Sequence, residues 1–163
     1  MRILITGAAG AIGKKLSEYL CETDHQIIPV VRRDGVISAD LQDEATVFRL
    51  VKEYAPDLIL HLAAITNLRF CEQNKEASRA TNVGITEILT RACSEFGTRM
   101  IFFSSDYVFG KYDHFWQEQD TPCPTTQYGI DKAASELVIR ERLSNYAIVR
   151  TAQLWLFRNL LQT

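Results

Sequence analysis

Apolar residues along this chain follow two alternating patterns, short continuous runs and longer amphipathic segments. Runs rich in Ile, Leu and Val predict buried strands, and apolar residues three and four apart predict helices that face a core. The expected strands cover residues 2–6, 26–31, 36–38, 58–61, 100–103 and 147–150. The expected helices cover residues 11–22, 43–54, 82–96 and 128–142. Residues 62–81 and 107–127 follow neither pattern, and we expect them to be irregular.

Strands that alternate with helices in this way are typical of one fold class. Each helix connects two parallel strands by a right-handed crossover, so helices come to cover both faces of a parallel sheet. In the first helix the apolar residues that should face the sheet are Ile12, Leu16, Tyr19 and Leu20. The sequence therefore predicts an α/β fold, a Rossmann-type doubly wound parallel sheet in a single domain.

Composition and charge narrow the functional classes. The 163 residues are 47% hydrophobic and 23% charged, as in ordinary globular proteins. With a net charge of −2 and no basic patch, we expect no nucleic-acid partner, and no apolar run is long enough for a membrane span. Met1 leads directly into the first strand, which leaves no room for a signal peptide, and the four cysteines are far apart, so we expect a cytoplasmic protein. The histidines and cysteines lack ligand spacing, and no metal site is expected.

The connection between the first strand and the first helix has the glycine spacing G-x-x-G-x-x-G. A dinucleotide pyrophosphate needs backbone amides and the positive end of a helix close by, and side chains would block that approach. We expect Gly7 to permit a tight turn, Gly10 to admit the phosphates and Gly13 to let the helix pack closely on the strand. Glycines also mark ordinary turns, but strand, glycines and helix come here in the order that a dinucleotide site requires.

The end of the second strand suggests which dinucleotide would be preferred. Arg32 and Arg33 stand where an NAD-selective site usually places an acidic residue. A guanidinium pair could bind a 2′-phosphate, so NADP(H) is the expected cofactor and NAD(H) the second choice. Two solvated arginines at a strand end are the alternative interpretation. Asp40 falls where a carboxylate could meet the adenine amino group, and a helix-capping role is also open for it.

A Tyr-x-x-x-Lys pair opens the last expected helix, where Tyr128 and Lys132 would share one face. An ammonium group nearby favours a phenolate, so we expect it to lower the pKa of Tyr128 and tune it for proton transfer. Alone, such a pair is more often structural. Ser105 strengthens the case, because it closes the fifth strand at the sheet edge where doubly wound folds bind ligands, and its hydroxyl could bond a substrate oxygen. Ser104 is expected to be its structural neighbour.

Together these residues resemble the extended short-chain dehydrogenase/reductase family, most closely its dTDP-4-dehydrorhamnose reductase branch. The resemblance runs from Met1 to about Thr151 and includes the segments 61–64, 82–86 and 105–109. It implies that Ser105, Tyr128 and Lys132 are catalytic, that Asn82 supports the lysine and that His61 is a buried strand residue. The cofactor-binding residues expected from the motif and the resemblance are Thr6, Gly7, Gly10, Ala11, Ile12, Gly13, Arg32, Arg33, Asp40, Leu41, Ala63, Ala64, Asn82, Tyr128 and Lys132.

The resemblance also sets expectations for domains and partners. Residues 1–151 would be an NAD(P)-binding Rossmann domain and residues 152–163 a short helical tail. Family members continue past this point into a substrate-binding part, which we expect to be absent from this sequence. The implied substrate is a nucleotide-linked sugar. Helices that begin at Asn82 and Tyr128 are expected to pair in a homodimer, as in similar enzymes.

Three functions fit these observations. The first is NADP(H)-dependent reduction of a nucleotide-linked 4-keto sugar. The second is a cofactor-binding regulatory or scaffolding module, and the third is a sugar-nucleotide epimerase. Related 4,6-dehydratases carry an Asp-Glu pair after the catalytic hydroxyl residue, where this chain has Asp106-Tyr107. That difference favours a reductase over a dehydratase.

Overall fold

Six strands form one sheet in the order β3-β2-β1-β4-β5-β6, and every neighbouring pair is parallel. The computed structural model describes residues 1–32, 37–110 and 115–152. The strands are β1 (Arg2–Thr6), β2 (Gln26–Val31), β3 (Ile37–Ser38), β4 (Leu58–His61), β5 (Arg99–Ser105) and β6 (Tyr146–Thr151). The helices are α1 (Ala11–Cys21), α2 (Glu44–Tyr54), α3 (Leu68–Gln73), α4 (Lys75–Arg79), α5 (Ile85–Phe96) and α6 (Gln127–Arg142). The expected doubly wound α/β fold is confirmed.

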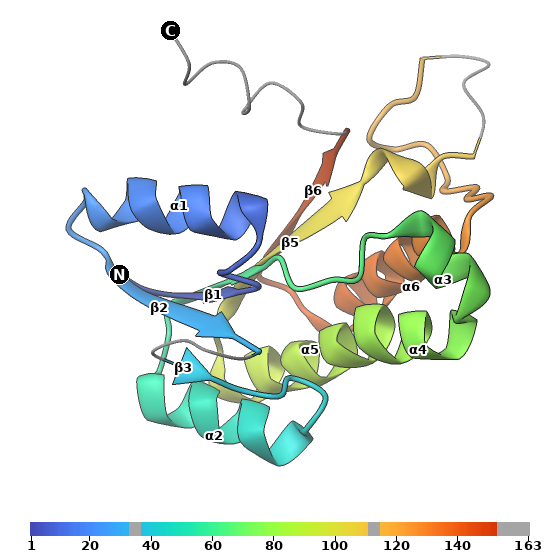
Figure 1. Cartoon of the computed structure of the whole chain (residues 1–163). Coiled ribbons are helices and arrows are strands. Elements are labelled where there is room, and N and C mark those ends of the chain that lie inside the picture. Colours follow the sequence, from blue (N-terminus) through green and yellow to red (C-terminus); the bar gives the residue numbers. More distant parts are fainter. Residues whose placement is uncertain (33–36, 111–114, 153–163) are drawn as a thin grey trace, which may run out of the picture.

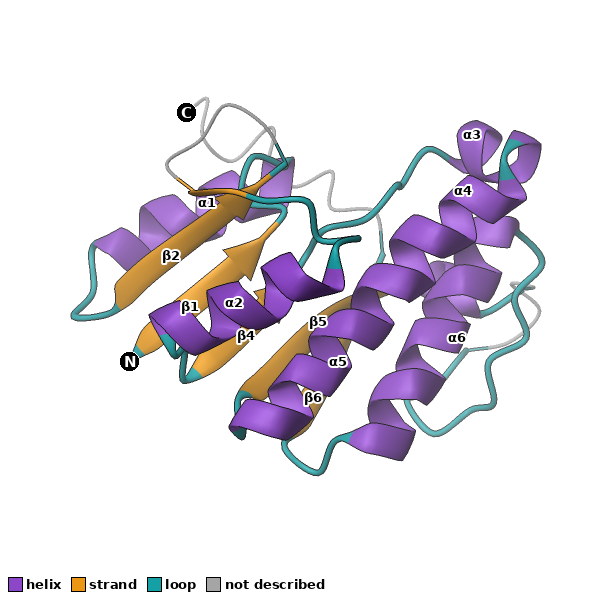
Figure 2. Cartoon of the chain, turned by 90° about the horizontal axis from the view of Figure 1, so that it is seen from below, coloured by secondary structure: helices purple, strands orange, loops and turns teal. Residues whose placement is uncertain are grey.

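Helices cover both faces of the sheet (Figure 1). Figure 2 shows α2, α5 and α6 in front of the strands and α1 behind them. The larger apolar cluster lies under α2, α5 and α6 and includes Leu4, Leu89 and Phe102, whereas Ile3 and Ile5 face the other way, toward α1. Alternate residues of one strand thus enter different clusters, as the two-residue period of a strand requires.

The direction in which successive strands are added to the sheet reverses between β1 and β4. From β1 the chain builds outward through β2 and β3, and it then crosses to the other side of β1 to form β4, β5 and β6. At such a switch point the loops that leave two adjacent strands turn away in opposite directions and open a crevice at their carboxyl ends. The loops that follow Thr6 and His61 are therefore the natural walls of a ligand site.

The segment between β4 and β5 differs most from the sequence prediction. Residues expected to be irregular form α3 and α4, and a π-helical turn at Ala80–Gly84 joins α4 to α5. Asn67 begins α3 because its side chain accepts a hydrogen bond from the Phe70 amide. Instead of one helix that starts at Asn82, a continuous helical run starts at Lys75, and α5 itself starts at Ile85. Each of these pieces is too short to show an amphipathic period, which is why the pattern did not reveal them.

Smaller differences concern single positions. Tyr19, expected on the buried face of α1, is 68% exposed, while Gly13 is the buried residue of that helix. Arg33 and most of the expected tail, residues 153–163, lie outside the described residues. In the part of the chain that the structure describes, no helix is long and apolar enough to span a membrane, and no three metal-ligating side chains gather.

Candidate cofactor and active site

The glycine turn after β1 is shaped by contacts that a side chain could not tolerate. Gly7 has a φ of +68°, and a Cβ atom there would lie 2.8 Å from the Ala63 nitrogen. At Gly13 a Cβ atom would lie 2.4 Å from the Gly7 carbonyl oxygen and 2.8 Å from the Ala8 Cα. These two glycines let the turn, helix α1 and the loop after β4 approach each other closely, which is the packing that the spacing predicts.

Gly10 has a different position, because it faces outward at the start of α1. Its backbone is extended, with φ −71° and ψ 168°, and a Cβ atom would approach only the Gly7 carbonyl oxygen, at 3.2 Å. No side chain caps α1, and its first turn holds no acidic residue. The first amides of a helix lack partners within the helix and carry its positive end. The exposed start of α1 can therefore accept an anion.

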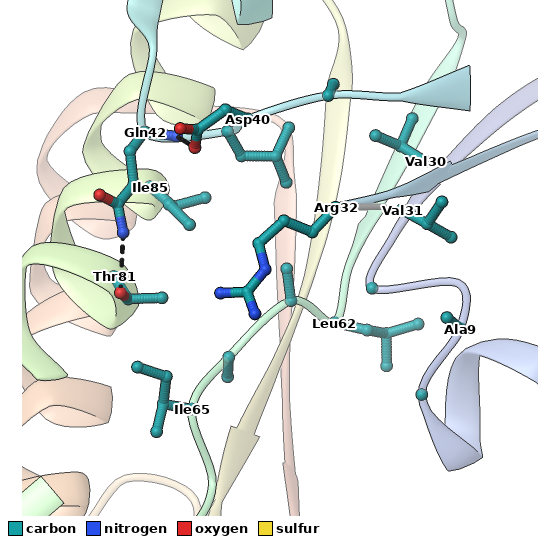
Figure 3. Close-up of a pocket in the computed structure, with 16 residues that line it drawn as sticks. Ala9, Val30, Val31, Arg32, Asp40, Gln42, Leu62, Ile65, Thr81 and Ile85 are labelled. Carbon is teal, nitrogen blue, oxygen red and sulfur yellow. Dashed lines mark hydrogen bonds between the residues drawn. The ribbon is translucent and has the colours of Figure 1, made fainter. Parts of the chain in front are cut away.

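On one side of this turn lies a cavity of about 380 Å³, a size typical of small-molecule sites (Figure 3). Arg32 extends from the end of β2, and its guanidinium group points into the cavity toward Ile65 and Thr81. On the facing wall Gln42 donates a hydrogen bond of 2.9 Å to Thr81. The cavity is lined by Gly7, Ala9, Gly10, Val30, Val31, Arg32, Ala39, Asp40, Leu41, Gln42, Leu62, Ala63, Ala64, Ile65, Thr81 and Ile85.

Asp40 lies on the wall of this cavity, and the helix-capping alternative for it is wrong. Its Oδ1 accepts a hydrogen bond of 3.0 Å from the Gln42 amide. The residue that caps α2 is Asp43, whose side chain accepts from the Thr46 amide. The carboxylate of Asp40 therefore stays at the edge of the cavity, where it can meet a hydrogen-bond donor on a ligand.

A second cavity, of about 430 Å³, lies on the other side of the glycine turn. Leu62 and Ala64 line both cavities, so the loop after β4 separates them. The second cavity brings together the three residues expected to be catalytic. It is lined by Ala11, Ile12, Leu62, Ala64, Thr66, Leu68, Phe103, Ser104, Ser105, Asp106, Tyr107, Tyr128, Lys132, Thr151 and Ala152.

The electrostatics of Tyr128 and Lys132 differ from the sequence expectation. Burial raises the pKa of Tyr128 to about 12, and interaction with the Ser105 side chain offsets this only in part. Lys132 is itself buried, which lowers its pKa to about 7, although nearby Glu136 favours its charged form. Its Nζ donates a hydrogen bond of 2.7 Å to the Phe103 carbonyl oxygen and lies 5.9 Å from the centre of the Tyr128 ring. The expected lowering of the tyrosine pKa is therefore wrong, because burial has the largest effect, and Tyr128 keeps its proton at neutral pH.

The two serines at the end of β5 have different surroundings. Ser104 donates a hydrogen bond of 2.6 Å to the buried carboxylate of Glu136, which Arg150 also binds through two nitrogens at 2.9 and 2.7 Å. Ser105 donates to Asp106 at 3.0 Å at the wall of the second cavity. Sequence reasoning missed Glu136, although it follows Lys132 by one helical turn and so shares its face.

Asn82 is buried and lines neither cavity. Its side chain accepts from the Ile65 amide at 2.8 Å and donates to the Ile65 carbonyl at 3.1 Å, and so holds the loop after β4. Its carbonyl oxygen accepts a hydrogen bond from Ser135 of α6 at 3.0 Å. Asn82 is thus joined to α6 through Ser135 and, by way of Ser78, to Asp131. Its support of Lys132, which the resemblance implied, stays a prediction.

The sequence and the architecture of this chain have counterparts among known proteins. The family model described as RmlD substrate binding domain matches residues 1–162. The dTDP-4-dehydrorhamnose reductase of Burkholderia thailandensis is 32% identical over 168 residues, which cover 100% of this chain and 54% of that protein.

Comparison with solved structures identifies relatives of the same kind. The crystal structure of dTDP-4-dehydrorhamnose reductase from Bacillus anthracis in complex with NADP is 31% identical, with a TM-score of 0.86 over 93% of this chain and 53% of that one. Bordetella bronchiseptica WbmG in complex with NAD is 25% identical, with a TM-score of 0.81 over 92% and 52%. This chain thus spans about half the length of the relatives it matches. It belongs to the RmlD substrate-binding domain family, in agreement with the resemblance to dTDP-4-dehydrorhamnose reductases.

Proposed function

We propose that the chain binds a nicotinamide dinucleotide across the carboxyl edge of its sheet and uses it to reduce the keto group of a nucleotide-linked 4-keto sugar. One observation carries this proposal: two cavities flank a glycine turn and share the residues of one loop, Leu62 and Ala64. A dinucleotide has the matching form, two nucleosides joined by a pyrophosphate. Relatives solved with NADP and with NAD support the same class of ligand.

The chain's own residues would hold the three parts of the cofactor. Arg32 and Asp40 would face the adenosine half, and the exposed start of α1 at Gly10 would take the pyrophosphate. Tyr128 and Lys132 would face the nicotinamide half in the second cavity.

When bound in its reduced form, the cofactor supplies a hydride to the keto carbon. The phenol of Tyr128 then donates its proton to the keto oxygen, and Ser105 holds that oxygen by a hydrogen bond. As the phenol loses its proton, the neighbouring ammonium of Lys132 stabilises the negative charge. The raised pKa of Tyr128 suits this role, because an acid must keep its proton until the hydride arrives.

Arg32 makes the preference for NADP(H) testable. A guanidinium group that bonds a 2′-phosphate gains charge-assisted hydrogen bonds, so Arg32→Ala should weaken NADPH binding on the order of tenfold and leave NADH binding nearly unchanged. Calorimetric titration of both cofactors measures this. Arg49→Ala, an exposed arginine on α2 outside both cavities, is the matched control. Tighter binding of NADH than of NADPH, unaffected by Arg32→Ala, would refute the preference.

Turnover separates the reductase from a module that only binds cofactor. NADPH oxidation is measured with a dTDP-4-keto sugar. The corresponding 4-hydroxy sugar is incubated separately with NAD⁺, and formation of its 4-epimer is followed by NMR, because epimerisation causes no net change in the cofactor. Loss of NADPH absorbance that depends on the keto sugar supports the reductase. Tight NADPH binding without turnover of either sugar would instead support the regulatory or scaffolding module.

We further propose that two copies associate through α5 and α6. Ile130 and Leu137 are 42% and 55% exposed and lie two turns apart on α6, so they form one apolar face. A second copy would cover this face, and Leu137→Glu should convert a dimer to a monomer while cofactor binding persists. Light scattering gives the mass of both forms, with Tyr19→Glu on α1 as the control. A wild-type chain that stays monomeric at high concentration contradicts the proposal.

A further inference from the structure

A continuous chain of buried hydrogen bonds joins the two loops of the candidate cofactor site to helix α5. His61, at the end of β4, lies in the middle of it and is 1% exposed. Its Nδ1 is 2.8 Å from the Thr6 hydroxyl of β1, and its Nε2 is 3.0 Å from the Thr86 hydroxyl of α5. The Thr86 hydroxyl is in turn 2.8 Å from the Asn82 carbonyl oxygen.

The direction of every bond follows from the Asn82 end. A carbonyl oxygen has no hydrogen, so Thr86 must donate its only hydroxyl hydrogen to Asn82. The Thr86 oxygen can then only accept, and the hydrogen between it and His61 must sit on Nε2.

His61 is neutral, because burial lowers its pKa to about 3 and the positive charge of Lys132 acts in the same direction. With its one ring hydrogen on Nε2, its Nδ1 is an acceptor, and Thr6 must donate to it.

This direction leaves both lone pairs of the Thr6 oxygen available for the loop after β4. The backbone amides of Leu62 and Ala63 donate to it at 3.1 and 3.2 Å. With the opposite tautomer, His61 would donate to Thr6, and three donors would compete for two lone pairs while the Thr6 hydrogen lost its acceptor. The two loop amides are therefore held only while Nε2 carries the hydrogen.

The loop that Thr6 holds is the wall shared by the two cavities. The Ala63 nitrogen lies 2.8 Å from the place of a Cβ atom at Gly7, so the loop and the glycine turn are in direct contact. A small shift of Ala63 would change the width of the crevice in which a dinucleotide would lie.

We propose that His61, fixed by Thr86 as the Nε2–H tautomer, is a positioning residue for the cofactor, because it makes Thr6 clamp the loop after β4 against the glycine turn. The proposal rests on the cofactor function proposed above. Thr86 lines neither cavity, so it acts on the site only through this chain of bonds.

The tautomer can be read directly by NMR. In the chain labelled with ¹⁵N-histidine, a long-range ¹H–¹⁵N spectrum distinguishes protonated from unprotonated ring nitrogens, and His61→Gln identifies the signals of His61. We expect a protonated Nε2 and an unprotonated Nδ1 between pH 6 and pH 8. A protonated Nδ1, or a mixture of tautomers, overturns the proposal without any variant of Thr86.

Two substitutions of Thr86 then test the effect on the cofactor. Thr86→Val keeps the shape but removes the acceptor for Nε2–H, so NADPH affinity should fall on the order of tenfold and the single tautomer should be lost. Thr86→Ser keeps the hydroxyl and should restore both. Thr90→Val is the matched control, because its hydroxyl is buried one turn further along α5 without a hydrogen-bond partner among the described residues.

The possible results distinguish a failure of the positioning role from a failure of the cofactor function. Wild-type affinity and tautomer in folded Thr86→Val, or an equal loss in Thr90→Val, would overturn the positioning role. If Thr86→Val does not fold, the wild-type spectrum and the NADPH affinity of Thr86→Ser test the positioning role instead. The role predicts a protonated Nε2 in the wild type and wild-type affinity in Thr86→Ser, and either result to the contrary overturns it. If the wild type binds neither NADPH nor NADH while Nε2 is protonated, the cofactor function and the positioning role both fail, and the tautomer assignment alone stands.

Discussion

Replacing Tyr128 by Phe should lower the rate of keto-sugar reduction by a factor of roughly 100 to 10,000 and leave NADPH affinity unchanged. The substitution keeps the ring, which packs edge-to-face against Tyr107 at 5.9 Å between ring centres, and removes only the proton donor. The measurement is NADPH oxidation with a dTDP-4-keto sugar, wild type and variant side by side.

The result is a ratio of two rates, so it holds whatever the absolute turnover of the 163-residue chain. Tyr19→Phe, on the exposed surface of α1, is the matched control and should react at the wild-type rate. If Tyr128→Phe retains more than about half of the wild-type rate, Tyr128 is not the acid. If it loses NADPH binding instead, the tyrosine holds the cofactor and the assignment of roles is wrong.

Gly10→Val should abolish cofactor binding, by a factor of at least about 100, without unfolding the domain. Gly10 is the one glycine of the motif at which a side chain should prevent cofactor binding without disturbing the fold. A side chain at Gly7 or Gly13 would collide with backbone at 2.8 or 2.4 Å, whereas at Gly10 the φ and ψ values suit any residue and the nearest atom is at 3.2 Å. The branched side chain of valine would occupy the space in front of α1 that a pyrophosphate needs.

Circular dichroism and thermal unfolding establish that Gly10→Val is folded, and calorimetry with NADPH measures binding. Gly84→Ala is the control, because a Cβ atom there meets nothing within 4 Å and the residue lines neither cavity. A folded Gly10→Val variant that binds NADPH with wild-type affinity would show that the glycine connection is only a turn.

The parts of this structure that could be predicted from sequence are those encoded locally. Each strand from β1 to β6 is a short apolar run, and the expected ranges agree with the observed ones to within two residues. The close contacts at Gly7 and Gly13 follow from a motif whose spacing directly reflects backbone geometry. Tyr128 and Lys132 share a cavity because a four-residue separation on a helix fixes their relative positions.

What could not be predicted depends on residues far apart in the chain. The helical pieces at 68–84 are stabilised by contacts such as that between Asn82 and Ile65, which a local pattern does not contain. The pKa of Tyr128 depends on burial, and an argument from its spacing to Lys132 gave the wrong direction. Likewise, the hydrogen bonds of His61 join three elements, so the sequence identified a buried strand residue and nothing of its role.

The central claim is that the two cavities and the glycine turn are one dinucleotide site, and a crystal structure of the chain with NADP⁺ tests it most directly. We predict the pyrophosphate at the start of α1 beside Gly10, the adenosine half against Arg32 and Asp40, and the nicotinamide within reach of Tyr128 and Lys132. A cofactor bound elsewhere on the surface, or a single nucleoside half held with the other cavity closed to it, would contradict the account.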